Sequence, residues 1–352
     1  KDNGGILVFH LPGSLSYLNV QLQKLNLSIL KTLKDVFKFV KVIPGDDFNI
    51  YLASKNYFNP NSSVFIERLK EREIPTLLLT PFHIEYRLHP RWVNWFYDTL
   101  SKAPLVDKNS SLLPKGLLYG LSYWNALFSP TLNEFFNLIE KINLKILIIF
   151  VSILTLMIFI LSSISRRFKR IGVPYAILTT GLVGMALDLM LIFIYQSFYG
   201  YVYHHIALLI TAFMSGLTLG GLFMTKKLSK LENKKFNFIL IEIGLILFSL
   251  AMIPLLIYLG KSKLNLSFIF FLTSIISGFL VGSEFPLANS LYQIKSATQT
   301  AGVLYALDLV GSWVGALIVS VAFIPVIGVI ETCIFLTILK LSSLFLITML
   351  KT

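Results

Sequence analysis

The sequence predicts an α-helical membrane bundle of about seven transmembrane helices, preceded by a smaller α/β domain. Hydrophobic residues make up 55% of the chain and charged residues only 14%, whereas soluble domains carry about 25% charged residues. Residues 141–352 contain repeated apolar runs of about 20 residues, which is the length needed to cross roughly 30 Å of hydrocarbon. Residues 1–140 instead alternate short strand and helix patterns. We therefore place the domain boundary between residues 140 and 141.

The net charge of +13 has a simple explanation in a membrane protein. The basic residues cluster in short loops between apolar runs, where they set the orientation in the bilayer. This distribution argues against a nucleic-acid partner. The single cysteine, Cys333, excludes an internal disulfide. The five histidines lack HxxxH and HExxH spacing, so we expect no metal site.

The first elements follow a strand, helix, strand, strand order. Residues 6–9 are a short apolar run, and residues 18–36 place leucine and isoleucine at helical spacing. Residues 37–43 and 49–53 read as two strands joined by a tight turn at 44–47. The acids of this turn, Asp46 and Asp47, follow Pro-Gly, so a turn role competes with a role as general base.

A second stretch of mixed pattern follows. Residues 64–73 predict an amphipathic helix and residues 74–80 a strand. Residues 90–100 predict an aromatic-rich helix whose apolar face carries side chains at i, i+3 and i+4, namely Trp92, Trp95 and Phe96. Core packing or contact with the membrane surface explains these aromatic residues.

Several ungapped motifs give the chain a resemblance to a known family. In the first part they are GGILVFHLPGSLSYLN, VIPGDDFNIYLAS, IERLKEREIPTLLLT and YWNALFSP. In the second part they are YGYVYHHIALLITAFMSGLTLGG, GSEFPLA and LYALDLVGSWVGALIVSVAFIPVIG. Together they resemble the bacterial spermidine synthase-like (polyamine aminopropyltransferase-like) proteins fused to membrane helices. The matching part is the C-terminal half of the soluble domain plus the membrane domain.

The resemblance implies a fold and an activity. The family's soluble lobe is a class I methyltransferase-like Rossmann domain whose last elements are a strand, a helix and an antiparallel strand pair. Its activity is aminopropyl transfer from decarboxylated S-adenosylmethionine, or a related nucleotide donor, to a polyamine. A carboxylate must deprotonate the attacking amine, and the family places that acid and the Gly-rich donor-binding turn in the first half of the fold.

This chain begins at Lys1 and has no GxGxxG spacing before Lys145. We therefore expect it to be a fragment of a longer enzyme, with the catalytic residues upstream of Lys1. Alone, it is expected to bind no cofactor and to be inactive.

The resemblance also suggests one wall of an amine site. Tyr119 and Trp124 match an aromatic pair near the end of the family's domain, where soluble members carry Tyr and His. The tryptophan is a departure, and simple packing is the competing interpretation for both residues. With Asp46, they are the substrate-binding candidates.

Seven membrane segments are expected, at residues 144–164, 174–198, 205–224, 238–259, 266–289, 301–327 and 329–350. Three GxxxG pairs lie within them, Gly216/Gly220, Gly278/Gly282 and Gly311/Gly315. Such pairs let helix backbones approach closely where lipid gives no hydrophobic drive to associate. They predict a compact bundle, and the same faces would suit a homo-oligomer.

Five ionisable residues lie inside the apolar runs and form the candidate membrane polar site: Asp188, Glu242, Glu284, Asp308 and Lys340. A charge near the bilayer centre costs at least about 2.5 kcal/mol. In one interpretation Lys340 pairs with one acid and the other acids sit near helix ends. In the other, the acids line a path for a proton, a cation or a polyamine, with Glu284 favoured because Pro286 is expected to break its helix and free backbone carbonyls beside it.

Two functions therefore remain open. The first is an aminopropyltransferase-like enzyme, and the second is a polytopic transporter or interaction module with a non-catalytic soluble lobe. Both place the protein in the bilayer, by resemblance the bacterial cytoplasmic membrane. The positive-inside rule puts the basic loops at 165–170 and 226–235 in the cytoplasm and the soluble lobe outside, which conflicts with a cytosolic donor, so the side of the lobe stays open.

Overall fold

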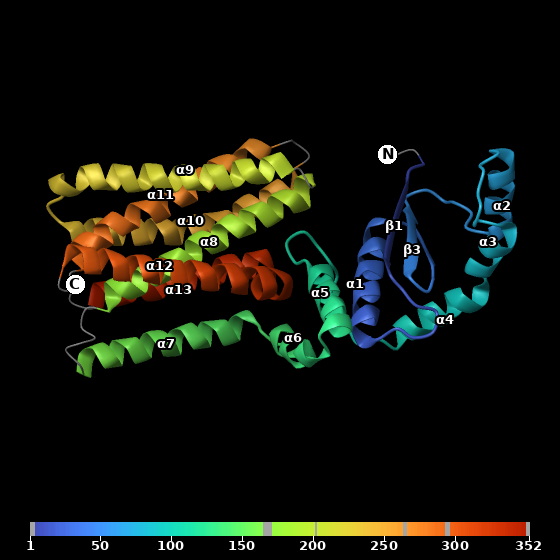
Figure 1. Ribbon diagram of the computed structural model, residues 1–352, viewed down its shortest axis with the longest axis horizontal. Helices are drawn as coiled ribbons and strands as arrows, with labels where there is room; N and C mark the ends of the chain where they lie inside the picture. Colours follow the sequence, from blue (N-terminus) through green and yellow to red (C-terminus); the bar gives the residue numbers. More distant parts are fainter. Residues whose placement is uncertain (1–3, 165–170, 201–202, 263–265, 293–295, 350–352) are drawn as a thin grey trace. The chain divides into compact units, whose positions relative to one another are not determined.

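The computed structural model describes residues 4–164, 171–200, 203–262, 266–292 and 296–349 (Figure 1). The basic loop expected at 165–170 lies outside the described residues, as do parts of the other loops. Two compact units are present: one holds the residues before 111 together with 114–137, and the other holds 111–113 together with 138–352. Each is described by itself below.

A three-stranded sheet forms the centre of the first unit. Its strands are β1 (Ile6–Pro12), β2 (Phe39–Ile43) and β3 (Phe48–Ser54). β3 lies in the middle and pairs antiparallel with both neighbours, so that Tyr51 sits opposite Phe9 on one side and Val42 on the other. The predicted order of strand, helix and antiparallel strand pair is confirmed. The sheet alone does not show a Rossmann domain.

Helix α1 (Val20–Val36) packs against one face of this sheet. It begins at Asn19, whose side chain accepts a hydrogen bond from the backbone N–H of Leu22 at 2.8 Å. Its buried stripe has the spacing of an amphipathic helix, with Leu22, Leu25, Leu30 and Leu33. The stripe and the inner face of β3 form the core of this unit.

A buried polar network joins α1 to the sheet. The Tyr51 hydroxyl donates to Asn26 Oδ1 at 2.6 Å, and Asn49 Nδ2 donates to the same oxygen at 3.0 Å. The Asn26 amide in turn donates to the Leu22 carbonyl at 2.9 Å. Burial raises the pKa of the Tyr51 phenol well above its usual value, so the hydroxyl stays protonated and remains a donor.

The first unit has further helices, namely α2 (Ser62–Glu71), α3 (Pro81–Arg87), α4 (Pro90–Ser101) and α5 (Lys115–Phe128). Of these, α4 and α5 pack against α1. The buried face of α4 is Val93, Phe96 and Leu100, so Phe96 belongs to the core, whereas Trp92 and Trp95 lie half-buried at its edges.

The strand predicted at residues 74–80 is wrong. This segment has no regular structure, and Leu77 and Leu78 are 97% and 88% exposed. An apolar run becomes a strand when a neighbour supplies the ladder hydrogen bonds, and the described sheet ends without adding this segment.

The second unit is a helical bundle. Its helices are α7 (Leu144–Ile164), α8 (Gly172–Tyr199), α9 (Tyr203–Lys227), α10 (Lys234–Lys261), α11 (Ser267–Leu291), α12 (Ala297–Ile318) and α13 (Gly328–Met349), with α6 (Asn133–Glu140) leading into it and the π-helical turn η4 (Val319–Ile327) joining the last two. Figure 1 shows α8 to α13 packed side by side, with α7 along one edge.

Six helical stretches among the described residues are long and apolar enough to cross a membrane, where seven were expected. The difference lies at Ala297–Met349, which is one helical stretch of 53 residues containing the last two predicted segments. At 1.5 Å per residue it would be about 80 Å long if straight, far beyond a bilayer core.

The chain reverses within this stretch, at Gly328. Its φ of +85° favours glycine, and the backbone N–H of Val329 donates to the Leu112 carbonyl at 2.8 Å. Along α8, Cys333 lies beside Met190 and Lys340 beside Thr180, so α13 runs antiparallel to α8. On α12, the order of contacts with α8 is the opposite, because Gly311 lies against Leu178 and Gly315 against Leu182.

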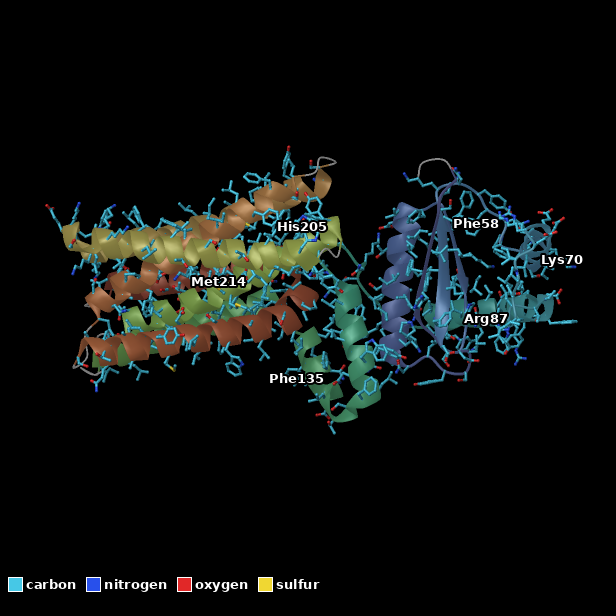
Figure 2. The ribbon with its side chains drawn as sticks, turned by 45° about the horizontal axis from the view of Figure 1, so that its top comes forward. Phe58, Lys70, Arg87, Phe135, His205 and Met214 are labelled. Atoms are coloured by element: carbon cyan, nitrogen blue, oxygen red, sulfur yellow. The ribbon has the colours of Figure 1, made fainter. Side chains whose placement is uncertain are left out.

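All three predicted glycine pairs bring helix backbones together inside the chain. On α9, Gly216 lies against the Ile275 carbonyl and Gly220 against the Phe279 carbonyl of α11. On α11, Gly278 and Gly282 lie against backbone carbonyls of α9. The third pair, Gly311 and Gly315 of α12, packs on α8. These contacts are made within a single chain, as expected for a compact bundle. Side chains such as Met214 on α9 point outward instead, 53% exposed, as lipid-facing residues do (Figure 2).

The glycine contacts give a first prediction. Gly282→Leu would put a side chain onto the Leu217 backbone, and overpacking of this kind costs about 1–3 kcal/mol or more. Gly302→Leu is the matched control, because no atom lies within 4 Å of a Cβ built at Gly302. We expect Gly282→Leu to lower the midpoint of unfolding in detergent clearly and Gly302→Leu to leave it unchanged. Equal midpoints would contradict the backbone contact.

Candidate functional site

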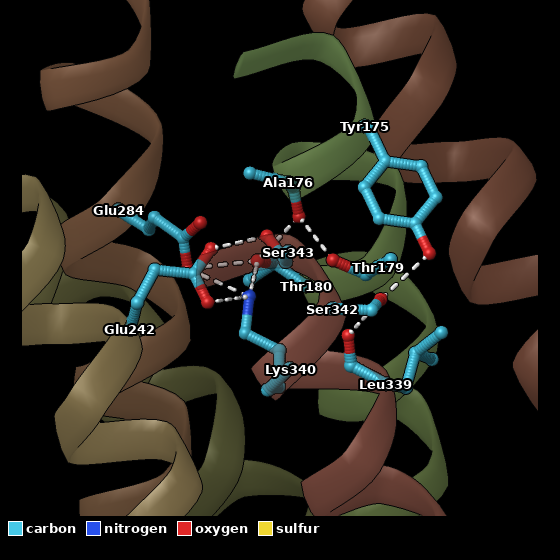
Figure 3. Close-up of polar contacts among 10 residues, drawn as sticks. All are labelled: Tyr175, Ala176, Thr179, Thr180, Glu242, Glu284, Leu339, Lys340, Ser342 and Ser343. Carbon is cyan, nitrogen blue, oxygen red and sulfur yellow. Dashed lines mark hydrogen bonds and ion pairs between the residues drawn. The ribbon is translucent and has the colours of Figure 1, made fainter. Parts of the chain in front are cut away.

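A fully buried cluster of three charged side chains lies inside the bundle (Figure 3). The Lys340 ammonium stands 2.9 Å from Glu242 Oε2 and 3.5 Å from Glu284 Oε2. All three side chains have 0% exposure. Of the five predicted membrane residues, these three are brought together, and the interpretation in which Lys340 pairs with one acid has to be extended to two.

Two hydroxyl groups complete the cluster. Lys340 Nζ donates to Thr180 Oγ1 at 2.7 Å, and Thr180 Oγ1 donates to Glu284 Oε2 at 2.7 Å. Ser343 Oγ donates to Glu242 Oε1 at 2.8 Å. Thr180 therefore links the ammonium and the carboxyl of Glu284 through one oxygen.

The side chains of the cluster come from four helices. Thr180 comes from α8, Glu242 from α10 and Glu284 from α11, while α13 provides both Lys340 and Ser343. Lys340 and Ser343 are three residues apart, so they share one face of α13. The neighbouring hydrogen bond between the Tyr175 and Ser342 hydroxyls, 2.9 Å long, fixes α13 against α8 next to this face.

The charges of the cluster do not balance. Two carboxylates and one ammonium sum to −1, and an uncompensated charge in a buried site is very unfavourable. One additional proton on the two carboxyl groups makes the cluster neutral. Glu284 Oε1 is buried and has no hydrogen-bond partner among the described residues, so this oxygen can carry the additional proton. The geometry thus provides a place for one exchangeable proton.

The other two predicted acids lie outside the cluster. The Asp308 backbone carbonyl and one of its carboxylate oxygens lie against Gly181, the residue after Thr180. Asp308 is thus close in height to the cluster but on another face of α8, and it is half-buried. Asp188 is 4% exposed on α8, about two turns beyond Thr180, and its Oδ1 has no hydrogen-bond partner among the described residues.

The helix break expected at Pro286 does not occur. α11 runs without interruption from Ser267 to Leu291 with Pro286 inside it. Proline removes one hydrogen bond, to the carbonyl four residues earlier, which here belongs to Gly282. That carbonyl faces Gly221 of α9, so it adds no ligand beside Glu284. Close packing on α9 lets the helix continue through the proline.

The three substrate-binding candidates of the first unit have separate surroundings. The exposed Asp46 accepts a hydrogen bond from the Leu15 backbone at 3.0 Å, as a turn residue does. Tyr119 is buried on α5, with the Lys24 ammonium 5.9 Å from its ring centroid. Trp124 is 52% exposed and stacks on Phe128 with ring centroids 5.8 Å apart. These positions fit a turn role for Asp46 and a packing role for Tyr119.

Within the described part of the chain, no group of three or more His, Cys, Asp or Glu side chains could hold a metal ion. Where Glu242 and Glu284 meet, the counter-ion is the Lys340 ammonium.

The hydroxyl members of the cluster were missed by sequence reasoning. Serine and threonine in membrane helices commonly bond the carbonyl of the preceding turn, as Thr179 does with Ala176 at 2.8 Å. The Thr180 hydroxyl has a single proton, and both the same carbonyl, at 2.8 Å, and Glu284 Oε2, at 2.7 Å, lie within its reach. The sequence carries no signal that separates one threonine from the other.

Comparison with known proteins adds no assignment: no protein family, curated protein or solved structure matches this chain.

The cluster predicts a specific pattern of stability. Lys340→Met would leave two buried acids without their counter-ion, and breaking a buried pair in this way costs about 3–5 kcal/mol. Replacing the whole cluster with neutral groups, as Lys340→Met with Glu242→Gln and Glu284→Gln, should restore most of the loss. Lys261→Met, at the exposed end of α10, is the control.

Denaturant unfolding in detergent measures both effects. A single Lys340→Met variant as stable as the triple variant would show that the charges are not coupled.

Proposed function

We propose that this chain is an integral membrane protein that moves a cation across the bilayer together with, or in exchange for, a proton carried by Glu242, Glu284 and Lys340. The observation that carries the proposal is the pair of fully buried carboxyl groups sharing one ammonium. Ionisable residues inside membrane helices are rare and commonly mark ion and proton pathways.

Further unpartnered polar atoms extend from the cluster along two helices. Ser249 lies seven residues after Glu242 on α10, and its buried Oγ has no hydrogen-bond partner among the described residues. Asn289 lies five residues after Glu284 on α11, and its Oδ1 is likewise unpartnered in the described structure. The end of α10 and the start of α11 both lie beside the end of α8, so α10 and α11 run in opposite directions and Ser249 and Asn289 lie on opposite sides of the cluster. Such atoms support ordered water, which can pass a proton on.

The chemistry of Lys340 suggests the class of cargo. A lysine side chain ends in a primary ammonium on an aliphatic stem, which is also the end group of a polyamine. The acid pair is occupied by Lys340, so an incoming ammonium would have to displace it. A polyamine is therefore the cargo whose ammonium group could replace that of Lys340 with the least rearrangement of the site. When no polyamine is bound, one proton on the two carboxyl groups keeps the cluster neutral.

Transport measurements test this proposal. Reconstituted in liposomes with an imposed pH gradient, the protein should take up labelled putrescine or spermidine and dissipate the gradient. Glu284→Gln should lower both rates at least tenfold because it removes the exchangeable proton, and Asp308→Asn should lower them less. Glu331→Gln is the matched control, because Glu331 is an acid of α13 outside the cluster.

A structural role for the cluster predicts a different result. In that case Glu284→Gln would destabilise the protein in detergent while leaving the residual uptake equal to that of Glu331→Gln. That outcome would remove the basis of the transport proposal.

A second candidate function is supported by the first unit. We propose that, as part of a longer spermidine synthase-like protein of the bacterial cytoplasmic membrane, this chain provides the last elements of an aminopropyltransferase-like lobe. The order of β1, α1 and the antiparallel β2–β3 pair supports it. So does the outer edge of β1, where no strand of the described structure pairs and Ile6, Leu7 and Val8 are 46%, 42% and 57% exposed. An apolar edge of this kind would suit further strands of one sheet.

The corresponding assay measures methylthioadenosine release from decarboxylated S-adenosylmethionine and putrescine. We expect no turnover by the purified chain above a control without protein, since removing a positioned base alone costs ~10²- to 10⁴-fold and the donor site is expected upstream. Turnover by the chain alone would show that the active site includes residues such as Asp46 and Tyr119 after all.

A further inference from the structure

A cavity of about 390 Å³ lies in the first unit, between the sheet and the helices α2 and α3. Its size is at the lower end of the range for small-molecule sites. The floor is the face of the sheet opposite α1 and includes Ile43, Phe48 and Ile50. Its walls are formed by α2, α3 and the segment between them.

The α2 wall of this cavity is an amphipathic helix whose apolar side is only partly covered. Phe65 and Leu69 line the cavity at i and i+4, yet no residue of α2 is buried. Helices of this length gain most of their stability from packing an apolar face. Something apolar in the cavity would therefore complete the packing of α2.

The polar part of the cavity is cationic. Arg68 of α2 and Arg72, which directly follows α2, lie four residues apart and line the cavity together with His83 and Arg87 of α3. None of the described residues that line the cavity is acidic. Three guanidinium groups around one apolar space would repel one another, and an anion between them would relieve that repulsion.

Arg87 is held in place by the sheet (labelled in Figure 2). Its Nη2 donates to the Phe48 carbonyl at 3.4 Å, and its guanidinium lies 5.9 Å from the Phe48 ring centroid. Gly45 leaves the room that the guanidinium occupies, because a Cβ there would collide with it. The Arg87 Nε is nevertheless buried and has no hydrogen-bond partner within the described structure. A buried donor without an acceptor is expensive, so the site is short of one acceptor.

From these four observations we propose that the cavity binds a small amphipathic anion, whose apolar body packs between Phe48, Phe65 and Leu69 and whose carboxylate or phosphate group is held by Arg68, Arg72 and Arg87. The guanidinium fork matches both anionic groups, each through paired N–H···O bonds. The site is independent of the cation transport proposed for the bundle.

Calorimetric titration of the whole chain in lipid nanodiscs tests the proposal. The probes are octanoate, octyl phosphate and neutral 1-octanol, with empty nanodiscs subtracted to remove partition into lipid. We expect saturable binding of at least one of the two anions, which identifies the group that the arginines prefer, and at least tenfold weaker binding of octanol.

Variants assign the binding to the cavity. Arg72→Gln and Arg87→Gln should each weaken anion binding about tenfold, since each removes charge-assisted hydrogen bonds, and Leu69→Trp should weaken it by filling the cavity. Arg91→Gln is the matched control, because Arg91 contacts Trp92 of α4 and does not line the cavity. The exposed Arg72 can be replaced without disturbing the core, so its effect stands even if Arg87→Gln impairs folding. Octanol binding as tightly as the anions, or Arg72→Gln behaving as Arg91→Gln does, would overturn the proposal.

Discussion

The membrane bundle depends on how one buried ammonium is shared by two buried carboxyl groups. Water cannot solvate Lys340, Glu242 or Glu284, since all three are fully enclosed, so each must be stabilised by the others. Removing one of the three alone would leave a buried charge uncompensated, which opposes the packing of α10, α11 and α13 around it. The same condition makes the site sensitive to protons, because the charge of the cluster is −1 without an additional proton and zero with one.

The glycine contacts make this arrangement possible. Side chains of ordinary length reach across a buried ion site only when helix axes are close, and Gly216, Gly220, Gly278 and Gly282 let α9 and α11 touch through their backbones. Gly311 does the same for α12 on α8. With α8 and α11 held from behind in this way, Thr180 and Glu284 can contact each other directly, at 2.7 Å. Close packing and ion pairing therefore support each other in this bundle.

The helical bundle, the order of the first strands, the close glycine contacts and the ionisable residues inside the helices could be predicted from the sequence. Each of these rests on a local signal: the length of an apolar run, alternation, or small residues four apart. Three features could not be predicted: the irregular structure of residues 74–80, the continuous helix at Pro286, and the part that the Thr180 and Ser343 hydroxyl groups take in the cluster. These depend on a neighbour that is distant in sequence, whether a strand partner, the backbone of α9 or a carboxylate on another helix. The separation of Asp308 from the cluster is of the same kind, since apolar context alone cannot say which face of a helix meets which neighbour.

The buried polar network around Asn26 and the buried cluster around Lys340 differ in how fully their polar atoms are satisfied. The Asn26 amide nitrogen donates to the Leu22 carbonyl and its oxygen accepts from Tyr51 and Asn49, and all of these partners are neutral. A fully satisfied neutral network fixes a fold and has nothing to exchange. In the bundle cluster, Glu284 Oε1 has no hydrogen-bond partner among the described residues, and the two carboxyl groups can gain or lose one proton. Natural proteins seldom retain such groups in a membrane without a use for them, so the bundle's function is best sought at Glu284.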